Sequence, residues 1–195
     1  MELEIKLLEK DEEINGILEL QQKNLPHNLS KDETVNQGFL TVIHFFDLLN
    51  KMNKEEKSVI AKDKRNRVIG YCLAMTKDLG STIEILKPFF FHLNELIIDN
   101  KSLNEFKVIY VGQACIQKEY RGMNLLSKMY AKYKEYFVPR YEIAVTEILQ
   151  RNIRSMSAHQ KIGFQPLDTY IAPNDEVCDI VFWDWRESPK NKIYK

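Results

Sequence analysis

The chain has 195 residues, of which 44% are hydrophobic and 29% charged, and its 28 basic side chains balance 28 acidic ones. This composition is typical of one globular domain and excludes a disordered or fibrous protein and the global positive field of a nucleic-acid binder. The first ten residues lack the apolar core of a signal peptide, and no apolar run approaches the roughly 18 residues of a membrane span. We therefore expect a single cytoplasmic domain over residues 1–195 with a disordered or extended tail at 187–195, and neither nucleic acid nor membrane as partner.

The first half of the chain contains strand and helix patterns separated by turn-prone segments. Hydrophobic spacing predicts a strand over 3–7, helices over 14–21 and 43–52, an antiparallel hairpin of strands over 58–62 and 68–75, and a helical insertion over 82–98. Residues 25–39 have the composition of a loop. The insertion contains three consecutive phenylalanines. Large aromatic side chains more often pack in a protein core than line a binding site, so we expect them in the core.

The second half begins with an apolar segment, 106–116, that is typical of a central strand covered on both faces. A helix from Leu125 towards Pro139, a strand over 143–148, a helix over 152–162 and two further strands follow. Gly112 and Ala114 leave one face of the central strand nearly bare. This indicates either a bulge where a ligand meets the main chain or tight packing of a helix, and the sequence leaves both open.

Three cysteines and four histidines are scattered along the chain. Cys72, Cys115 and Cys178 are odd in number and lie in apolar stretches, which favours reduced, buried thiols over disulfides. No cysteine has a histidine at ligand spacing. We therefore predict no metal site.

The junction between the central strand and the next helix, residues 117–126, is a candidate phosphate site. A helix start presents unpaired backbone N–H groups and the positive end of the helix dipole. Arg121 can add donors, and Gly122 lets the backbone approach a ligand. Taken alone, an Arg-Gly pair before a helix is usually only a turn.

A second constellation lies on the helix over 152–162. Asn152, Ser155 and His159 stand at i, i+3 and i+7, which aligns an amide, a hydroxyl and an imidazole along one stripe. Such a stripe normally faces solvent, and Asn152 is also a favoured N-cap residue.

Together the two constellations resemble the signature motifs of the GNAT superfamily of N-acetyltransferases. Arg121-Gly122-Met123-Asn124-Leu125-Leu126 lies in the register of the family's Arg/Gln-x-x-Gly-x-Gly/Ala motif. Asn152, His159 and Lys161-Ile162-Gly163-Phe164 match the second motif in order and separation. The close resemblance covers residues 108–165. It implies an α/β fold with a central, twisted, mostly antiparallel sheet, splayed between the fourth and fifth strands, and helices on both faces.

The resemblance also implies a site for acetyl-CoA as co-substrate. In the family, the fourth strand pairs with the pantetheine arm, amides of the following turn cradle the pyrophosphate, and the second motif adds side chains. The residues implied here are Ala114, Cys115, Ile116, Arg121, Gly122, Met123, Asn124, Leu125, Leu126, Asn152 and Ser155. Asn124 and Leu126 stand where the family has glycine, which puts the affinity for pyrophosphate in question.

The resemblance identifies the catalytic residues less directly than the cofactor-binding residues. The family commonly uses a tyrosine of the second motif to protonate the departing thiolate, and here that position holds His159, which either donates this proton as an imidazolium or merely caps or packs. Glu147, at the end of a central strand, is the leading candidate for the base that deprotonates the amine, and a surface carboxylate is the alternative. Tyr110 is the second choice.

The resulting prediction is an enzyme that transfers acetyl from acetyl-CoA to an amine of a small molecule or peptide. The acceptor pocket is predicted from the loop 25–39, the second helix and the insertion 82–98. Two alternatives are a non-catalytic acyl-CoA-binding or regulatory module and a nucleic-acid binder using Lys128, Lys132 and Lys134. An aromatic last strand with Trp183 and Trp185 would offer the edge of a homodimer, although burial of both tryptophans explains it equally well.

Overall fold

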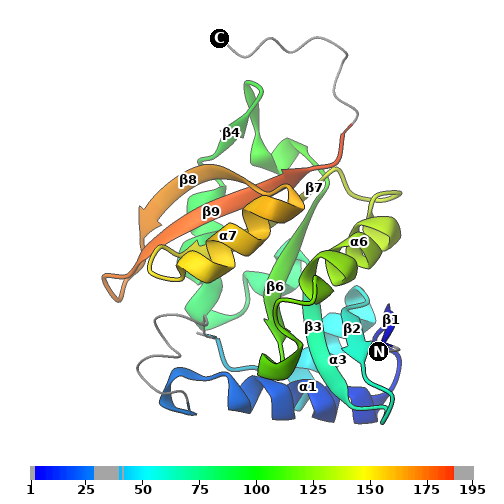
Figure 1. Cartoon of the computed structure of the whole chain (residues 1–195). Helices are drawn as coiled ribbons and strands as arrows, with labels where there is room; N and C mark the ends of the chain where they lie inside the picture. Colours follow the sequence, from blue (N-terminus) through cyan, green and yellow to red (C-terminus); the bar gives the residue numbers. More distant parts are fainter. Residues whose placement is uncertain (1–2, 29–39, 41, 187–195) are drawn as a thin grey trace.

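A computed structural model of the chain describes residues 3–28, 40 and 42–186 (Figure 1). Most of the predicted loop 25–39 and the predicted tail 187–195 lie outside these residues. The main elements are β1 (Glu4–Leu7), α1 (Asp11–Lys23), α3 (Phe46–Glu55), β2 (Val59–Lys62), β3 (Val68–Met75), α4 (Lys77–Gly80), α5 (Lys87–Leu93), β4 (Ile97–Ile98), β5 (Lys101–Ser102), β6 (Val108–Ile116), α6 (Leu125–Phe137), β7 (Ile143–Leu149), α7 (Ile153–Ile162), β8 (Gln165–Ile171) and β9 (Val177–Asp184). Short 3-10 turns cover Pro26–Asn28, Glu84–Leu86, Leu103–Glu105 and Lys118–Tyr120.

Seven strands form one sheet in the order β1-β2-β3-β6-β7-β9-β8. All neighbouring strands in it are antiparallel except β6 and β7, which are parallel. Parallel neighbours need a crossover, and α6 supplies it between them. The predicted α/β fold with a mostly antiparallel central sheet is therefore confirmed.

The sheet opens between its fourth and fifth strands, as predicted. Residues 108–110 of β6 pair with residues 143–145 of β7. Both strands continue beyond this short ladder, β6 to Ile116 and β7 to Leu149. The two strands diverge in Figure 1, where α7 lies over the widened end. The facing main-chain groups of the continuing segments are thus not used to pair β6 with β7.

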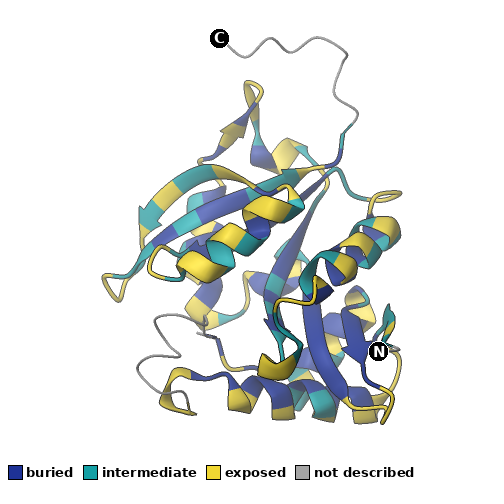
Figure 2. Ribbon diagram, viewed as in Figure 1, coloured by how far each residue is buried: buried dark blue, intermediate teal, exposed yellow. Residues whose placement is uncertain are grey.

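Helices cover both faces of the sheet. Leucines and isoleucines of α1 and α3 join one buried cluster with the large side chains of β3 and β6. Met129, Tyr130, Tyr133 and Phe137, all on one stripe of α6, join a second cluster on the opposite face. Figure 2 shows the same division, with buried central strands and helices that are exposed on their outer sides. The apolar stripes thus hold the strands whose ends form the candidate site.

Gly112 marks a β-bulge in β6. Leu73 of β3 faces Gln113, whereas the next residue, Ala74, faces Val111, so β6 carries one extra residue at position 112. A bulge bends the strand and redirects its main-chain groups. The bulge is therefore present, and helix packing is present too, because a Cβ added at Gly112 would meet Cε of Met52 on α3 at 3.1 Å.

The predicted helical insertion over 82–98 was only partly correct. A 3-10 turn and α5 occupy residues 84–93, but Ile97 and Ile98 form β4, which pairs with β5 in a small hairpin. Asp99 and Asn100 join the two strands and have φ angles of 53° and 63°. Two consecutive left-handed residues make the turn that matches the twist of a two-residue hairpin, and Asp and Asn adopt it more readily than most residues.

The cysteines and tryptophans lie within the protein. All three cysteines are free and buried, as predicted. Trp185 is buried, and the rings of Trp183 and Trp185 pack at 5.5 Å from each other and against tyrosines of α6. Core packing therefore accounts for the aromatic last strand, and a homodimer stays a prediction. Among the described residues, no helix has the length and apolar character needed to cross a membrane.

Candidate active site

A cavity of about 490 Å³ lies beside the open end of the sheet. Its walls are the end of β6, the start of α6 and the first turns of α7. The residues lining it are Asn24, Leu40, Ala114, Cys115, Ile116, Arg121, Gly122, Asn124, Leu125, Leu126, Ser127, Asn152, Arg154, Ser155, Ser157, Ala158, His159 and Lys161. The structure thus brings together every predicted cofactor-binding residue except Met123, whose half-exposed side chain lies outside this set.

The main chain at the end of β6 points into the opening. The amide of Gln117 donates to the carbonyl of Ile69 at 2.8 Å, which makes these two residues a hydrogen-bonded pair between β6 and β3. Hydrogen-bonded pairs alternate in an antiparallel ladder, so Cys115 also bonds towards β3. The main-chain groups of Ala114 and Ile116 therefore face the other way, towards the gap before β7.

The start of α6 adds further unpaired donors. Gly122 and Asn124 both have left-handed backbones, with φ angles of 79° and 57°. They turn the chain sharply from β6 into the helix. The amide of Lys128 donates to the carbonyl of Asn124 at 3.2 Å and so makes the first hydrogen bond of the helix. The amides of residues 125–127 precede it at the positive end of the helix dipole, with no acidic side chain in the first turn.

The side chains around this cavity give it a positive charge. Arg121, Arg154 and Lys161 line it, and no aspartate or glutamate is among its described lining residues. The guanidinium of Arg121 donates to the carbonyl of Ile116 at 3.1 Å and to the side chain of Asn24. Arg121 therefore also ties the end of β6 to the end of α1. A chain with no net charge thus has a locally basic cavity that suits a polyanion.

The stripe on α7 faces the cavity rather than solvent. Asn152 caps the helix, because its side chain accepts a hydrogen bond from the amide of Ser155 at 3.3 Å. Asn152, Ser155 and His159 line this cavity and also a second one beside it. The capping role foreseen for Asn152 and its position at the cavity are both present.

His159 is held as a neutral ring. Its Nδ1 lies 2.8 Å from the carbonyl of Ser155, an acceptor that requires this nitrogen to carry the proton. Its Nε2 then accepts from the hydroxyl of Tyr130 at 2.7 Å. Burial lowers the pKa of His159 to about 4. Near neutral pH this environment favours the neutral ring over an imidazolium, and the role of His159 as the acid stays a prediction beside the packing alternative.

The second cavity, of about 100 Å³, continues from the first towards β7 and α5. Apolar and polar side chains both line it: Val42, Met75, Leu86, Phe89, Val111 and Leu149 lie beside Gln113, Thr146, Glu147, Asn152, Ser155 and His159. Glu147 is the one carboxylate among its described lining residues. Leu40 and Ala114 border both cavities, so the two spaces meet beside the bulge of β6.

Glu147 reaches this second cavity from the diverging end of β7. Burial raises the pKa of its carboxyl group above the ordinary value, and a hydrogen bond from the hydroxyl of Tyr170 partly opposes the rise. The surface-carboxylate alternative does not describe Glu147, which is only partly exposed. A partly buried carboxylate whose pKa is raised by burial has the properties of a proton acceptor.

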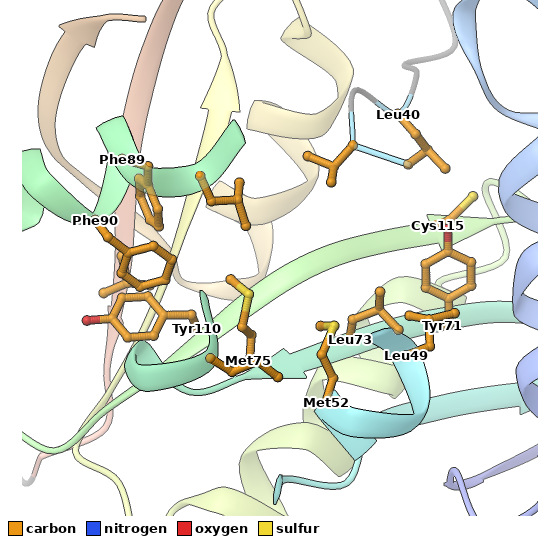
Figure 3. Packing of buried hydrophobic residues seen from close by; sticks show 14 of the residues in the cluster. Leu40, Leu49, Met52, Tyr71, Leu73, Met75, Phe89, Phe90, Tyr110 and Cys115 are labelled. Carbon is orange, nitrogen blue, oxygen red and sulfur yellow. The ribbon is translucent and has the colours of Figure 1, made fainter. Parts of the chain in front are cut away.

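Tyr110 does not reach either cavity. It is 2% exposed and packs edge-to-face with Phe89 and Phe90, at ring distances of 6.2 and 4.9 Å (Figure 3). Burial also raises the pKa of its hydroxyl. Tyr110 lies where β6 and β7 still pair, before the strands diverge, so the structure does not support it as a base.

Sequence reasoning missed several residues of the site. Asn24 and Leu40 come from the N-terminal third, and Arg154 and Lys161 add charge from α7. Tyr170 contacts Glu147 from β8, 23 positions along the chain. The basic residues could have been found by extending the helical stripe of α7. Asn24, Leu40 and Tyr170 carry no local pattern that connects them to the site.

The chain was compared with known proteins. No protein-family model matches the sequence, and no curated protein has a significant match. Solved structures do resemble it. A chain of the NatC complex bound to Gag peptide and CoA superposes with a TM-score of 0.65 at 14% identity, covering 95% of this chain and 100% of that one.

Two further structures have the same arrangement. The ribosomal-protein-S18-alanine N-acetyltransferase from Escherichia coli has a TM-score of 0.62 at 8% identity, covering 99% of this chain and 100% of that one. A spermidine N-acetyltransferase chimera from Vibrio cholerae and a human enzyme has a TM-score of 0.57 at 12% identity, covering 94% and 96%. The chain therefore has the fold of the GNAT N-acetyltransferases, as its motifs indicated.

Proposed function

We propose that the protein is an acetyl-CoA-dependent N-acetyltransferase that acetylates an amine of a small molecule or peptide. One observation carries the proposal. A basic cavity at the start of α6 joins a small cavity of mixed polar and apolar lining that contains a carboxylate, and the two meet at the diverging main chain of β6. The first space suits a nucleotide co-substrate, and the second suits an amine.

The residues present fit acetyl-CoA. Amides of residues 125–127 and the basic side chains of Arg154 and Lys161 would hold its phosphates. Main-chain groups of Ala114 and Ile116 would pair with the peptide-like pantetheine arm. This assignment agrees with two similar structures, those of the NatC and NatB complexes, which are bound to CoA. When bound, acetyl-CoA would supply a thioester carbonyl; attack by the amine breaks its carbon–sulfur bond, and the departing CoA thiolate takes up the second proton of the amine, which gives acetylated amine and CoA thiol.

The chain's own contribution to the reaction would be proton removal and orientation. Glu147 accepts a proton from the ammonium form of the acceptor, directly or through a water molecule, and thereby makes the amine nucleophilic. Main-chain N–H groups at the bulge of β6 stabilise negative charge on the carbonyl oxygen. His159, as a neutral ring hydrogen-bonded at both nitrogens, fixes α7 against Tyr130 of α6.

The direct test is the release of CoA thiol from acetyl-CoA by the purified protein across a panel of polyamines, amino acids and short peptides. We expect thiol release that depends on the amine, with acetylated amine detected by mass spectrometry. Binding of acetyl-CoA with no turnover on any amine would contradict the enzyme and favour the acyl-CoA-binding module. Failure to bind acetyl-CoA would contradict both.

Glu147→Gln tests the proposed base. The substitution preserves shape but removes the proton acceptor, so we expect kcat to fall by about 10²-fold or more while the affinity for acetyl-CoA is retained. Glu142→Gln is the matched control, because Glu142 lies just before the same strand and accepts a hydrogen bond from the amide of Lys107 away from both cavities. Equal activity of Glu147→Gln and Glu142→Gln would exclude Glu147 as the base.

A further inference from the structure

Glu147 is connected to a group of polar side chains behind the small cavity. The hydroxyl of Tyr170, on β8, donates to the Glu147 carboxylate. The ring of Tyr170 stacks on His92 of α5, with 5.0 Å between ring centroids and 18° between planes. His92 Nε2 lies 2.8 Å from a carboxylate oxygen of Asp168, also on β8. The candidate base is thus held from behind by two elements that do not themselves carry it.

This arrangement restricts both members of the hydrogen bond. Asp168 holds His92 through their hydrogen bond. The nearly parallel stack of His92 on Tyr170 in turn restricts the orientation of the Tyr170 ring. Tyr170 is partly buried, so its hydroxyl has little access to water as an alternative partner. A carboxylate that accepts one fixed hydrogen bond keeps its remaining lone pairs in a defined direction. For Glu147, the side of the carboxylate that stays open faces the second cavity.

The other titratable groups near Glu147 are few among the described residues. Cys178 of β9 is buried and uncharged, since burial raises the pKa of its thiol to about 11. His159 of α7 borders the same cavity as a neutral ring. The residues that β6 contributes to this cavity are not ionisable. Tyr170 is therefore the group that sets the hydrogen bonding of the Glu147 carboxylate.

We propose that Tyr170 is a positioning residue that holds the Glu147 carboxylate for proton transfer, and that His92 on the insertion helix clamps Tyr170 in place. This inference rests on the proposed function. It gives α5 a second role. Besides lining the second cavity, α5 would help to position the base Glu147 through His92. It also explains why a stacked histidine–tyrosine pair and an ion pair are built between elements that are otherwise distant in sequence.

The test is the titration of Glu147 in Tyr170→Phe. The substitution removes the hydroxyl and keeps the ring. Because the hydrogen bond favours the carboxylate, its loss should raise the pKa of Glu147 further, by about one unit. The acid limb of the kcat/KM–pH profile should move to higher pH by the same amount, with about a tenfold loss on that limb. Carbon-13 NMR of the glutamate side chains reports the same pKa without any substrate.

Tyr141→Phe is the matched control. The hydroxyl of Tyr141 donates to Glu56 in the same way, beyond the C-terminal end of α6, and neither residue lines either cavity. This variant should leave the acid limb and the Glu147 titration unchanged. His92→Leu, which removes the clamp but keeps Tyr170, should shift the Glu147 titration in the same direction by a smaller amount, and it serves if Tyr170→Phe fails to fold.

The outcomes separate the two proposals. An unshifted Glu147 titration in both Tyr170→Phe and His92→Leu overturns the positioning role. An equal shift in Tyr141→Phe overturns it as well, because the effect would then be nonspecific. If the wild-type protein releases no thiol with any amine, the proposed function fails, whereas the NMR titration still decides whether Tyr170 sets the state of Glu147.

Discussion

His44 and His159 are both buried as neutral imidazoles, on opposite faces of the sheet. His159 has partners on both ring nitrogens. His44 has Gln21 beside Nδ1 at 3.1 Å, and its buried Nε2 has no hydrogen-bond partner among the described residues. Burial lowers the pKa of each ring to about 4. Each histidine therefore resists protonation in the folded protein but not in the unfolded chain.

This difference predicts a loss of stability in mild acid. Between about pH 6.5 and about pH 4 the unfolded chain binds protons on these histidines that the folded protein does not, so the free energy of unfolding falls as pH falls. We expect urea unfolding at pH 7 and pH 5 to show the decrease, and His44→Leu to reduce it. A decrease of the same size in His44→Leu would contradict the account of His44.

The sequence alone indicated the backbone conformation of some site residues but not the protonation state of others. Asn124 stood where the family has glycine, and its tolerance of a left-handed backbone was readable in advance. The neutral state of His159 was not, because it depends on Tyr130, 29 positions away. The environment of Glu147 likewise depends on Tyr170. Contacts between distant positions decide protonation, and local spacing does not report them.

The turn into α6 is the element on which the cofactor site depends. Asn124 is its N-cap residue, with no hydrogen bond from its own side chain to the helix. Its contribution is therefore the left-handed backbone itself. Gly122 shares this conformation, and a Cβ added there would meet no atom within 4 Å. The turn thus leaves open space immediately in front of the helix amides.

Substitutions at Asn124 should separate backbone shape from side-chain chemistry. Asn124→Ala should destabilise the protein by roughly 1 kcal/mol and weaken binding of acetyl-CoA, because alanine tolerates a left-handed backbone poorly. Asn124→Gly should keep the affinity, because glycine adopts this backbone without strain. Calorimetric titration of the two variants checks both statements. Equal weakening in both would show that the amide side chain, and not the backbone, matters.

Most elements were predictable because their apolar residues repeat at the period of a strand or a helix. The strands β2, β3, β6 and β7 and the helix α6 lie within a few residues of the expected ranges. The hairpin of β4 and β5 was missed because two-residue strands show no periodicity. Its signal was the pair Asp99-Asn100, whose left-handed turn was concealed within an apolar, aromatic segment.

At the scale of the whole molecule, the proposed function depends on a discontinuity in the sheet. Crossover through α6 makes β6 and β7 parallel neighbours, and their ladder ends after three residue pairs. Beyond that point the strands diverge, with α6 and α7 starting on either side of the opening. The same divergence exposes main-chain donors in one cavity and brings Glu147 into the other.

The overall topology followed from the sequence, but the two cavities did not. The order of strands and helices and the two motifs indicated a splayed sheet because few arrangements satisfy them. The size and lining of the cavities depend on how α1, α5 and α7 pack, which the sequence pattern leaves undetermined. Most of the predicted acceptor loop 25–39 lies outside the described residues, and the segment that follows it lines the second cavity through Leu40 and Val42.

The central claim is that the end of β6 and the start of α6 bind the pantetheine and phosphates of acetyl-CoA. Titrating the isotopically labelled protein with CoA while recording backbone amide spectra tests it most directly. We predict saturable shifts concentrated at Ala114, Ile116 and residues 125–127. Shifts confined to other surfaces, or none at millimolar CoA, would contradict the account.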